Sequence, residues 1–273
     1  MPDLNWNITL WDGSYDWSSE GEEWSYWWGG SEAQWFGGIY PRIHRFFPAK
    51  QVLEIAPGFG RWTRFLIPGC NKYVGIDLAE QAINACNKHF GHIPQAHFFQ
   101  NDGLHLDAAT NGAFDFIFSF DSLVHAEIDV LERYIPQLIN KLSLTGVAFI
   151  HHSNFNEIND NIENPHSRAV TVSGEKFANL VEANGGKVLI QEIVNWGGPD
   201  LIDCFTLFGK FDHYKQTETV VLHNNGWVNE MNLIRENQSH YSKIAVAGAG
   251  LCYSGTSRVS RMSRIINKLR RFL

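Results

Sequence analysis

The chain has 273 residues, which is enough for one α/β domain with extensions or for two small domains. It is 44% hydrophobic and 19% charged, so it can bury a sizeable core, and no run of about 18 apolar residues predicts a membrane-spanning helix. The formal net charge is −7. An acidic chain is unsuited to wrapping nucleic acid, because that affinity comes mostly from neutralising phosphates.

The start of the chain and its cysteines indicate the cellular compartment. The first 17 residues are acidic and polar and lack the charged and apolar regions of a secretory signal, so we expect none. The cysteines are scattered without a CxxC pair, which favours inert thiols in a reducing cytosol over a disulfide framework or a zinc site. They are Cys70, Cys86, Cys204 and Cys252.

Residues 1–50 are rich in aromatic side chains and precede the first predicted strand. Seven of the ten tryptophans lie here: Trp6, Trp11, Trp17, Trp24, Trp27, Trp28 and Trp35. Acidic side chains are interleaved with them: Asp12, Asp16, Glu20, Glu22 and Glu23. The glycine pairs in "WWGG" and "WFGG" offer flexible points at which such a segment can close over a substrate.

Residues 51–210 alternate strand and helix patterns, and we expect them to form the core domain. The apolar runs that predict strands are 51–56, 72–77, 96–100, 114–120, 146–152, 187–194 and 201–208. Strands that alternate with helices indicate a mostly parallel, doubly wound α/β sheet covered on both faces. In such a sheet, ligands bind beyond the carboxyl ends of the strands.

Three helices are predicted between these strands. Residues 79–90 and 127–142 space their apolar side chains at intervals of three and four, although Pro136 should kink or break the second helix. A third helix should begin after a cap at Ser173 and end at Gly185 or Gly186.

The stretch "VLEIAPGFGRWTRFL", residues 52–66, predicts a strand, a glycine turn and a helix. Gly58 and Gly60 permit a tight turn and a close ligand approach. The third glycine of the NAD fingerprint is missing, because Thr63 stands in its place. Glu54 lies inside the strand, and Asp77 ends the next strand, where an acid is placed to accept hydrogen bonds from ribose hydroxyls.

Two further strand ends carry polar residues. In "QNDG" after the third strand, Asp102 is placed to accept from an adenine amino group, with Asn101 at the ring edge, although Asp-Gly is also an ordinary turn pair. The fourth strand runs into a loop in "FDFIFSFDSLVHAE".

These motifs, "VLEIAPGFG", "GIDL", "NDG" and "FDFIFSFDSLVH", together resemble the class I S-adenosylmethionine-dependent methyltransferases over about residues 50–155. The resemblance implies a seven-stranded sheet that ends in an antiparallel pair, 187–194 with 201–208, and S-adenosylmethionine as cofactor. The cofactor-binding residues that it implies are Glu54, Ala56, Gly58, Gly60, Arg61, Asp77, Leu78, Asn101, Asp102, Gly103, Ser119, Phe120 and Asp121. Pro57 departs from the family's usual Gly or Cys.

Methyl transfer to a hydroxyl requires a general base, and histidine suits that role near neutral pH. His125 follows the fourth strand and is our first candidate. His151 or His152, at the end of the fifth strand, would orient the base or the substrate, and Asp121 would fix an imidazole or a substrate hydroxyl. The alternative for each histidine is a purely structural role.

A metal site is a further alternative, because oxygen and nitrogen ligands gather at the same strand ends: Asp121, His125, Glu127, His151 and His152. Their spacing matches no compact ligand motif, so we assign no metal.

The aromatic front zone suggests what the acceptor is. Tryptophan faces stack on the apolar faces of sugar rings, and we expect Trp27, Trp28 and Trp35 to contact the substrate as part of a lid. The alternative is that these tryptophans only pack a helical cap onto the sheet.

The end of the chain has two parts. Residues 211–257 are polar and should be irregular. Residues 258–273, "RVSRMSRIINKLRRFL", carry six Lys/Arg and no acid, so the residues before them have a net charge of −13, the difference between −7 and +6. Their spacing predicts a basic amphipathic helix that contacts the inner face of the plasma membrane. The alternatives are packing on the acidic body or on a second subunit.

Together these features predict an enzyme that O-methylates a sugar hydroxyl of a glycan, a lipid-linked saccharide or a nucleotide sugar. The first alternative is methylation of a small aromatic or carboxylic metabolite. The second is a protein that binds the cofactor without turnover. Nucleic-acid methylation is disfavoured by the acidic body and by the absence of an N-P-P-Y type signature.

Deleting residues 258–273 tests the membrane contact. We expect the full chain to sediment with anionic liposomes at low salt and the truncated chain to remain in the supernatant, because each Lys or Arg near an anionic surface contributes about 1 kcal/mol. Neutral phosphatidylcholine liposomes are the control. Undiminished sedimentation of the truncated chain would contradict the assignment.

Overall fold

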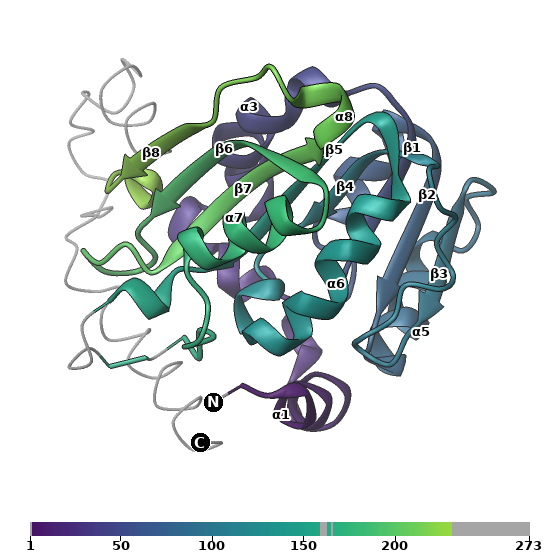
Figure 1. Cartoon of the computed structure of the whole chain (residues 1–273). Helices are drawn as coiled ribbons and strands as arrows, with labels where there is room; N and C mark the ends of the chain where they lie inside the picture. Colours follow the sequence, from purple (N-terminus) through teal and green to yellow (C-terminus); the bar gives the residue numbers. More distant parts are fainter. Residues whose placement is uncertain (1, 159–162, 165, 231–273) are drawn as a thin grey trace, which may run out of the picture. The chain divides into compact units, whose positions relative to one another are not determined.

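The computed structural model describes residues 2–158, 163–164 and 166–230, which include an eight-stranded sheet in the order β3-β2-β1-β4-β5-β7-β6-β8 (Figure 1). Its strands are β1 (Ala49–Ile55), β2 (Cys70–Asp77), β3 (Ala96–Gln100), β4 (Phe114–Ser119), β5 (Leu142–Ser153), β6 (Gly186–Val194), β7 (Asp203–Lys210) and β8 (Val220–Asn224). The first five strands pair in parallel, and β7 pairs antiparallel with both β5 and β6. The doubly wound fold and the antiparallel pair are therefore confirmed, with one strand more than expected.

The additional strand comes from a segment expected to be irregular. Within residues 211–230, β8 pairs in parallel with β6 at the edge of the sheet. The run of three β-branched or leucine residues, Val220 to Leu222, is the sequence signal for this strand. It is short and exposed, so it gives no alternating pattern to detect.

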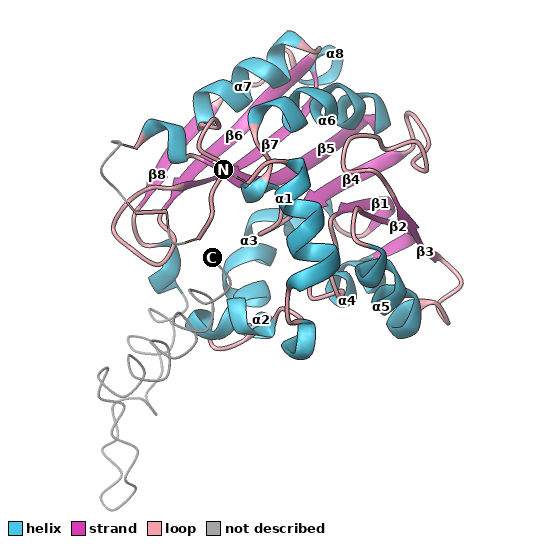
Figure 2. Ribbon diagram, turned by 90° about the horizontal axis from the view of Figure 1, so that it is seen from below, coloured by secondary structure: helices cyan, strands magenta, loops and turns pink. Residues whose placement is uncertain are grey.

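Helices cover both faces of the sheet (Figure 2). The described α-helices are α1 (Leu4–Thr9), α2 (Ser31–Gln34), α3 (Tyr40–Ile43), α4 (Thr63–Leu66), α5 (Glu80–Phe90), α6 (Ile128–Lys141), α7 (Gly174–Ala183) and α8 (Phe211–Tyr214). None of the helices in the described ranges is long and apolar enough to cross a membrane.

Two of these helices can be compared directly with the predicted cap at Ser173 and the predicted break at Pro136. The Ser173 side chain accepts a hydrogen bond from the Lys176 N–H and caps α7, as predicted. The helix α6 passes through Pro136 without a break. Proline removes one backbone bond, but the buried apolar side chains on both sides of it, such as Ile135 and Leu138, keep α6 on the sheet.

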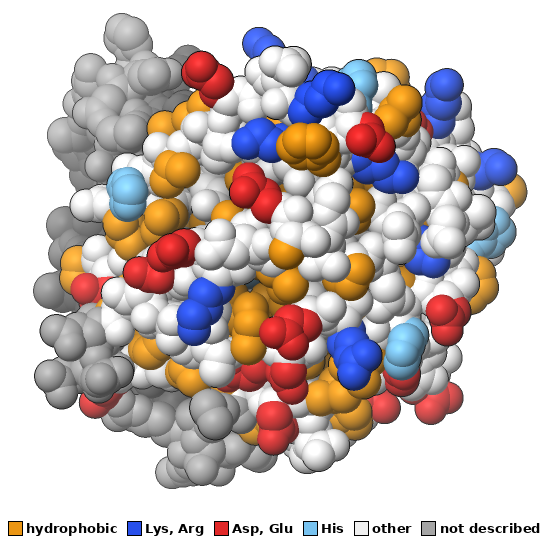
Figure 3. All heavy atoms as spheres, in the orientation of Figure 1, with side chains coloured by type: hydrophobic (Ala, Val, Ile, Leu, Met, Phe, Trp, Pro, Cys, Tyr) orange, Lys and Arg blue, Asp and Glu red, His pale blue; other side chains and the backbone are white. Residues whose placement is uncertain are grey.

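The core has one layer on each side of the sheet. On one face, α6 packs beside β4 and β5 and α7 over β6 and β7, as Figure 1 shows from the front. The other face is covered by α4, α5 and the tryptophan-rich segment, whose Trp28 and Trp35 are buried there. Figure 3 shows acidic and basic side chains scattered among one another on the described surface of the α6–α7 face.

Arg42 of α3 joins the last described residues to the sheet. Its guanidinium donates to both carboxylate oxygens of Glu192, at 2.6 and 2.7 Å, and of Glu230, at 2.7 and 2.9 Å. It also lies 4.8 Å above the Trp227 ring, and Asn224 donates to both glutamates. One cation thus compensates two largely buried carboxylates.

Arg42→Met should lower the free energy of unfolding by about 3 kcal/mol, because it leaves two carboxylates side by side without their cation. Urea denaturation measures the change. Arg45→Met, at an exposed position near the same helix, is the control and should change stability by less than about 0.5 kcal/mol. A loss below about 1 kcal/mol for Arg42→Met would mean that the ion pairs contribute little.

Candidate active site

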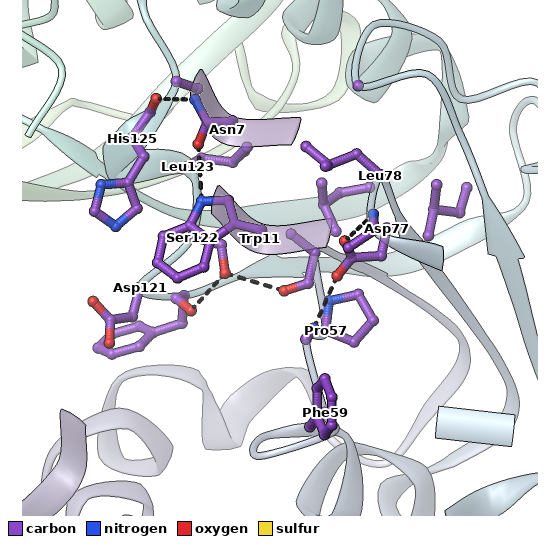
Figure 4. A pocket seen from close by; sticks show the side chains of 18 of the residues that line it. Asn7, Trp11, Pro57, Phe59, Asp77, Leu78, Asp121, Ser122, Leu123 and His125 are labelled. Atoms are coloured by element: carbon purple, nitrogen blue, oxygen red, sulfur yellow. Dashed lines mark hydrogen bonds between the residues drawn. The ribbon is translucent and has the colours of Figure 1, made fainter. Parts of the chain in front are cut away.

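A pocket opens at the carboxyl ends of β1, β2 and β4, and residues between Leu4 and Trp24 also line it (Figure 4). Of the residues expected to bind cofactor or catalyse, the structure brings these to the pocket lining: Ala56, Gly58, Arg61, Asp77, Leu78, Asn101, Gly103, Phe120, Asp121 and His125. Those outside the lining are Glu54, Gly60, Asp102, Ser119, His151, His152, Trp27, Trp28 and Trp35.

The glycine turn after β1 has two different roles at its two glycines. Gly58 has φ +58° and lines the pocket, where an added Cβ would approach Trp17 at 3.4 Å. Gly60 has φ +90°, and a Cβ there would collide with the Phe90 ring of α5. The first glycine therefore serves the pocket, and the second permits close packing of a helix.

Asp77 connects the turns that follow β1 and β2. Its two carboxylate oxygens accept from the Gly58 and Ala79 N–H groups, each at 2.9 Å. Burial raises the pKa of Asp77 to about 6, although these backbone hydrogen bonds oppose the shift. Each oxygen retains a lone pair, so the carboxylate can both hold the turn and accept from a ligand hydroxyl.

Glu54 faces the protein rather than the pocket. Its carboxylate accepts hydrogen bonds from Thr63 at 2.7 Å and from the Tyr73 hydroxyl. Burial raises the pKa of Glu54 to about 7. The acid inside β1 thus joins β1, β2 and α4, and the sequence pattern alone did not distinguish this role from ligand binding.

The loop after β3 presents Asn101 and Gly103 to the pocket, but not Asp102. The Asp102 carboxylate is exposed and accepts from the Leu104 and His105 N–H groups at 2.9 and 2.8 Å. This is the ordinary Asp-Gly turn considered above. Asn101 donates to the Tyr134 hydroxyl at 3.0 Å, so its side chain is held beside the pocket.

The end of β4 holds Asp121 in an unusual backbone conformation, with φ +60°. This turn lets the Asp121 N–H donate to His151 Nδ1 at 3.0 Å while its carboxylate accepts from Arg61 at 2.8 Å. Ser122 donates to the Ala56 carbonyl at 3.0 Å and joins the β4 and β1 turns. Ser119 is buried below them and does not reach the pocket.

Asp121 belongs to a network of buried charges. Arg168 donates to both oxygens of Asp203, at 2.7 and 2.8 Å, and lies 3.9 Å from Asp121. His151 Nε2 lies 3.1 Å from the same Asp203. Burial alone would raise the pKa of Asp203, but Arg168 and His151 hold it below its usual range. The guanidinium groups of Arg61 and Arg168 thus balance the carboxylates of Asp121 and Asp203 in a buried environment.

Of the three candidate histidines, His125 lines the pocket. Its Nδ1 lies 2.8 Å from the Ser167 carbonyl, which fixes the proton on Nδ1 and leaves Nε2 as the acceptor. Nε2 has no hydrogen-bond partner among the described residues. Burial lowers the pKa of His125 to about 4, with the Arg168 charge acting in the same direction. The ring is therefore neutral at physiological pH.

His151 and His152 lie on opposite faces of the sheet, because neighbouring residues of a strand alternate. His152 bonds to Ser153 and Thr206 and stacks on Phe177 at 3.9 Å, away from the pocket. Its expected role in orienting base or substrate is therefore wrong. His151 is buried on the other face, where its Nδ1 accepts from the Asp121 N–H.

The tryptophans that we expected to contact the substrate do not line the pocket. Trp28 and Trp35 are 1% and 3% exposed and belong to the core, whereas Trp27 is 44% exposed on the surface. Trp11, Trp17 and Trp24 line the pocket instead. The interleaved acids mostly bond to the protein, as Asp12 does to Gln81 and Glu23 to Tyr15. Composition indicated an aromatic cap but not which rings face inwards.

The residues considered for a metal do not converge. The Glu127 carboxylate accepts from the Val170 and Thr171 N–H groups at 3.2 and 3.0 Å, so it serves the loop before α7. In the part of the chain that the structure describes, no group of three or more His, Cys, Asp or Glu side chains is placed to hold a metal ion.

Comparison with known proteins agrees with this geometry. Residues 52–146 match the family model described as methyltransferase domain. Over 115 residues the chain is 25% identical to phosphoethanolamine N-methyltransferase 1 of Arabidopsis thaliana, a match that covers 42% of this chain and 23% of that protein. The chain therefore spans less than a quarter of this curated relative's length.

Solved structures show the same fold at low identity. The PH0226 protein of Pyrococcus horikoshii OT3 has a TM-score of 0.53 at 17% identity and covers 66% of this chain and 90% of its own. An S-adenosylmethionine-dependent methyltransferase of Clostridium acetobutylicum has 0.52 at 15%, covering 74% and 95%. N-methyltransferase NodS of Bradyrhizobium japonicum, in complex with S-adenosyl-L-homocysteine, has 0.50 at 16%, covering 63% and 85%.

The methyltransferase-domain match over residues 52–146, the strand order and the four strand-end turns agree with the class I S-adenosylmethionine-dependent methyltransferases, whose cofactor is S-adenosylmethionine. The pocket fits this group. Gly58 keeps the turn free of a side chain, Asp77 offers a carboxylate to a ribose, and Leu78 adds apolar lining suited to adenine. The indole N–H of Trp62, which is also a lining residue, is buried and has no hydrogen-bond partner in the described ranges.

Asp77→Asn should weaken S-adenosylhomocysteine binding about a hundredfold, because an amide cannot accept from both backbone N–H groups and ribose hydroxyls. Wild-type affinity should also fall as pH drops below about 6, where the carboxylate becomes protonated. Calorimetric titration measures both effects. Asp102→Asn is the control and should retain the wild-type affinity. Equal affinities for Asp77→Asn and wild type would contradict the cofactor assignment.

Proposed function

We propose that the protein transfers a methyl group from S-adenosylmethionine to a hydroxyl oxygen of a sugar, with His125 as the general base. The observation that carries this proposal is the position of His125, which lines the cofactor pocket, has its Nδ1 engaged by the Ser167 carbonyl, and has no partner for Nε2 among the described residues. When bound, the cofactor supplies an electrophilic methyl group.

The chain's own groups have three tasks in this proposal. His125 Nε2 removes the hydroxyl proton as the oxygen attacks, and the Ser167 carbonyl stabilises the resulting imidazolium through the Nδ1–H. Asp121 and Arg61 orient the acceptor by hydrogen bonds, and both line the pocket. The buried surroundings limit the access of water to the reacting groups. Holding the acceptor in line with the methyl group contributes much of the rate.

A sugar acceptor is supported by the mixture of rings and charges in the pocket. Trp11 and Trp24 offer flat apolar faces, while Asp121 and Arg61 of the same lining offer an acceptor and donors. Sugar rings present both apolar C–H faces and hydroxyl groups. The class of acceptor that we propose is thus a glycan, a lipid-linked saccharide or a nucleotide sugar.

An amine is the second candidate acceptor. The Arabidopsis relative and NodS are both named N-methyltransferases. A carboxylate such as Asp121 and the faces of Trp11 and Trp24 also suit a cationic ammonium group. The same neutral histidine would take the proton that an amine must lose. A small aromatic or carboxylic acceptor, or cofactor binding without turnover, are the remaining alternatives.

We also propose that this chemistry takes place in the cytoplasm next to a membrane. The basis is the charge contrast between the basic residues 258–273 and the acidic remainder of the chain. Those 16 residues lie outside the described residues, so the liposome experiment above decides the matter. Lipid-linked acceptors would be reached at such a surface.

His125→Gln should lower kcat by about 10²- to 10⁴-fold and leave the affinity for S-adenosylhomocysteine within about threefold of wild type. The measurement is release of S-adenosylhomocysteine in a screen of sugars, amines and phenols. His105→Gln, at an exposed site, is the control. Turnover of amines alone would select N-methylation, and full activity of His125→Gln would refute the proposed base.

A further inference from the structure

The chain from Asp3 to Trp24, here called the N-terminal arm, touches every turn that builds the cofactor pocket. Its contacts are Trp17 stacked on Phe59 at 4.4 Å, Asp12 and the Trp11 carbonyl accepting from Gln81, Leu4 against Gly103, and Asn7 donating to the His125 carbonyl. The turns after β1, β2, β3 and β4 are all included. The arm is thus a wall of the pocket rather than a separate extension.

Asn7 makes the contact between the arm and the base. Its Nδ2 lies 2.9 Å from the His125 carbonyl and 2.9 and 3.0 Å from the carbonyls of Asp3 and Pro2. Its Oδ1 accepts from the Trp11 indole at 3.0 Å. The side chain is buried, and both ends of its amide are used, as Figure 4 shows. An asparagine so enclosed fixes the backbone of His125 relative to α1.

The same stretch of the arm encloses the His125 ring. Trp6 and Trp11 have ring centroids 6.0 and 5.4 Å from the imidazole. The Nδ1 edge faces the Ser167 carbonyl instead. The arm therefore supplies both the backbone anchor and the apolar neighbours of the base.

We propose that Asn7 is a positioning residue, which seats and shields His125 only while the arm is docked on the β4 loop. The proposal rests on His125 being the base. Undocking would remove Trp6 and Trp11 from the imidazole and admit water to it. The base is then competent only when the arm covers the cofactor pocket, which couples cofactor enclosure to proton transfer.

Titration of the ring reports on this coupling. Burial is the main cause that lowers the pKa of His125 to about 4, and Arg168 adds to it. Asp121, Asp203 and the Ser167 carbonyl act in the opposite direction and do not belong to the arm. Loss of the arm should therefore move the pKa upwards, towards the ordinary 6.5 of a solvated histidine.

The experiment is a pH titration of ¹³Cε1-labelled histidine by NMR, with His125 assigned from the signal missing in His125→Gln. Wild type should show no titration of this signal between pH 5 and 8. Asn7→Ala and the isosteric Asn7→Asp, whose carboxylate would face three carbonyl oxygens, should both show it titrating near pH 6. Ile8→Ala, 40% exposed on the same helix, is the matched control.

Calorimetry with S-adenosylhomocysteine accompanies the titration, and both Asn7 variants should bind about tenfold more weakly than wild type. An unchanged His125 signal in a folded Asn7 variant, or a wild-type signal that already titrates near 6.5, would overturn the inference. Failure of wild type to bind S-adenosylhomocysteine would instead refute the proposed function. The NMR result stands apart from it, because it requires neither cofactor nor acceptor.

Discussion

The buried ion network of Arg61, Asp121, Arg168 and Asp203 is the constraint on which the site depends. Charges removed from water are tolerated only when their partners are held in place, so each member fixes the next. Asp121 accordingly keeps its left-handed backbone conformation, which directs its N–H at His151 and its carboxylate at the pocket. Because Asp203 belongs to β7, the antiparallel end of the sheet supports chemistry performed at its parallel half.

Burial also explains why the His125 imidazole beside these charges is neutral, because burial disfavours its protonated form. Arg168 repels a proton on His125, and the Ser167 carbonyl selects the tautomer that leaves Nε2 free. The proposed base is thereby held as a neutral imidazole. The geometry depends on residues from the arm, the β4 loop and the segment before α7, which are distant in sequence.

Local patterns predicted what local physics determines. Strand periodicity, the Ser173 cap and the strand-end position of Asp77 could be predicted because each depends on neighbouring residues. The choice between His151 and His152, the inward role of Glu54 and the identity of the lining tryptophans depend on which face of an element turns towards the pocket. Packing between segments that are distant in sequence decides which face this is, and neither composition nor residue spacing predicts that packing. The roles of Arg168 and Asp203 could not be predicted for the same reason, since no sequence motif surrounds these residues.

The indole rings of Trp11, Trp17 and Trp24 lie in mutual contact, with centroids 5.6 to 6.0 Å apart. Chromophores this close share their electronic excitations, so the pocket wall carries an intrinsic optical signature in the ultraviolet. Any ligand that parts or reorients these rings alters that signature. Near-ultraviolet circular dichroism can therefore report ligand binding in this pocket without a label, before an acceptor is known.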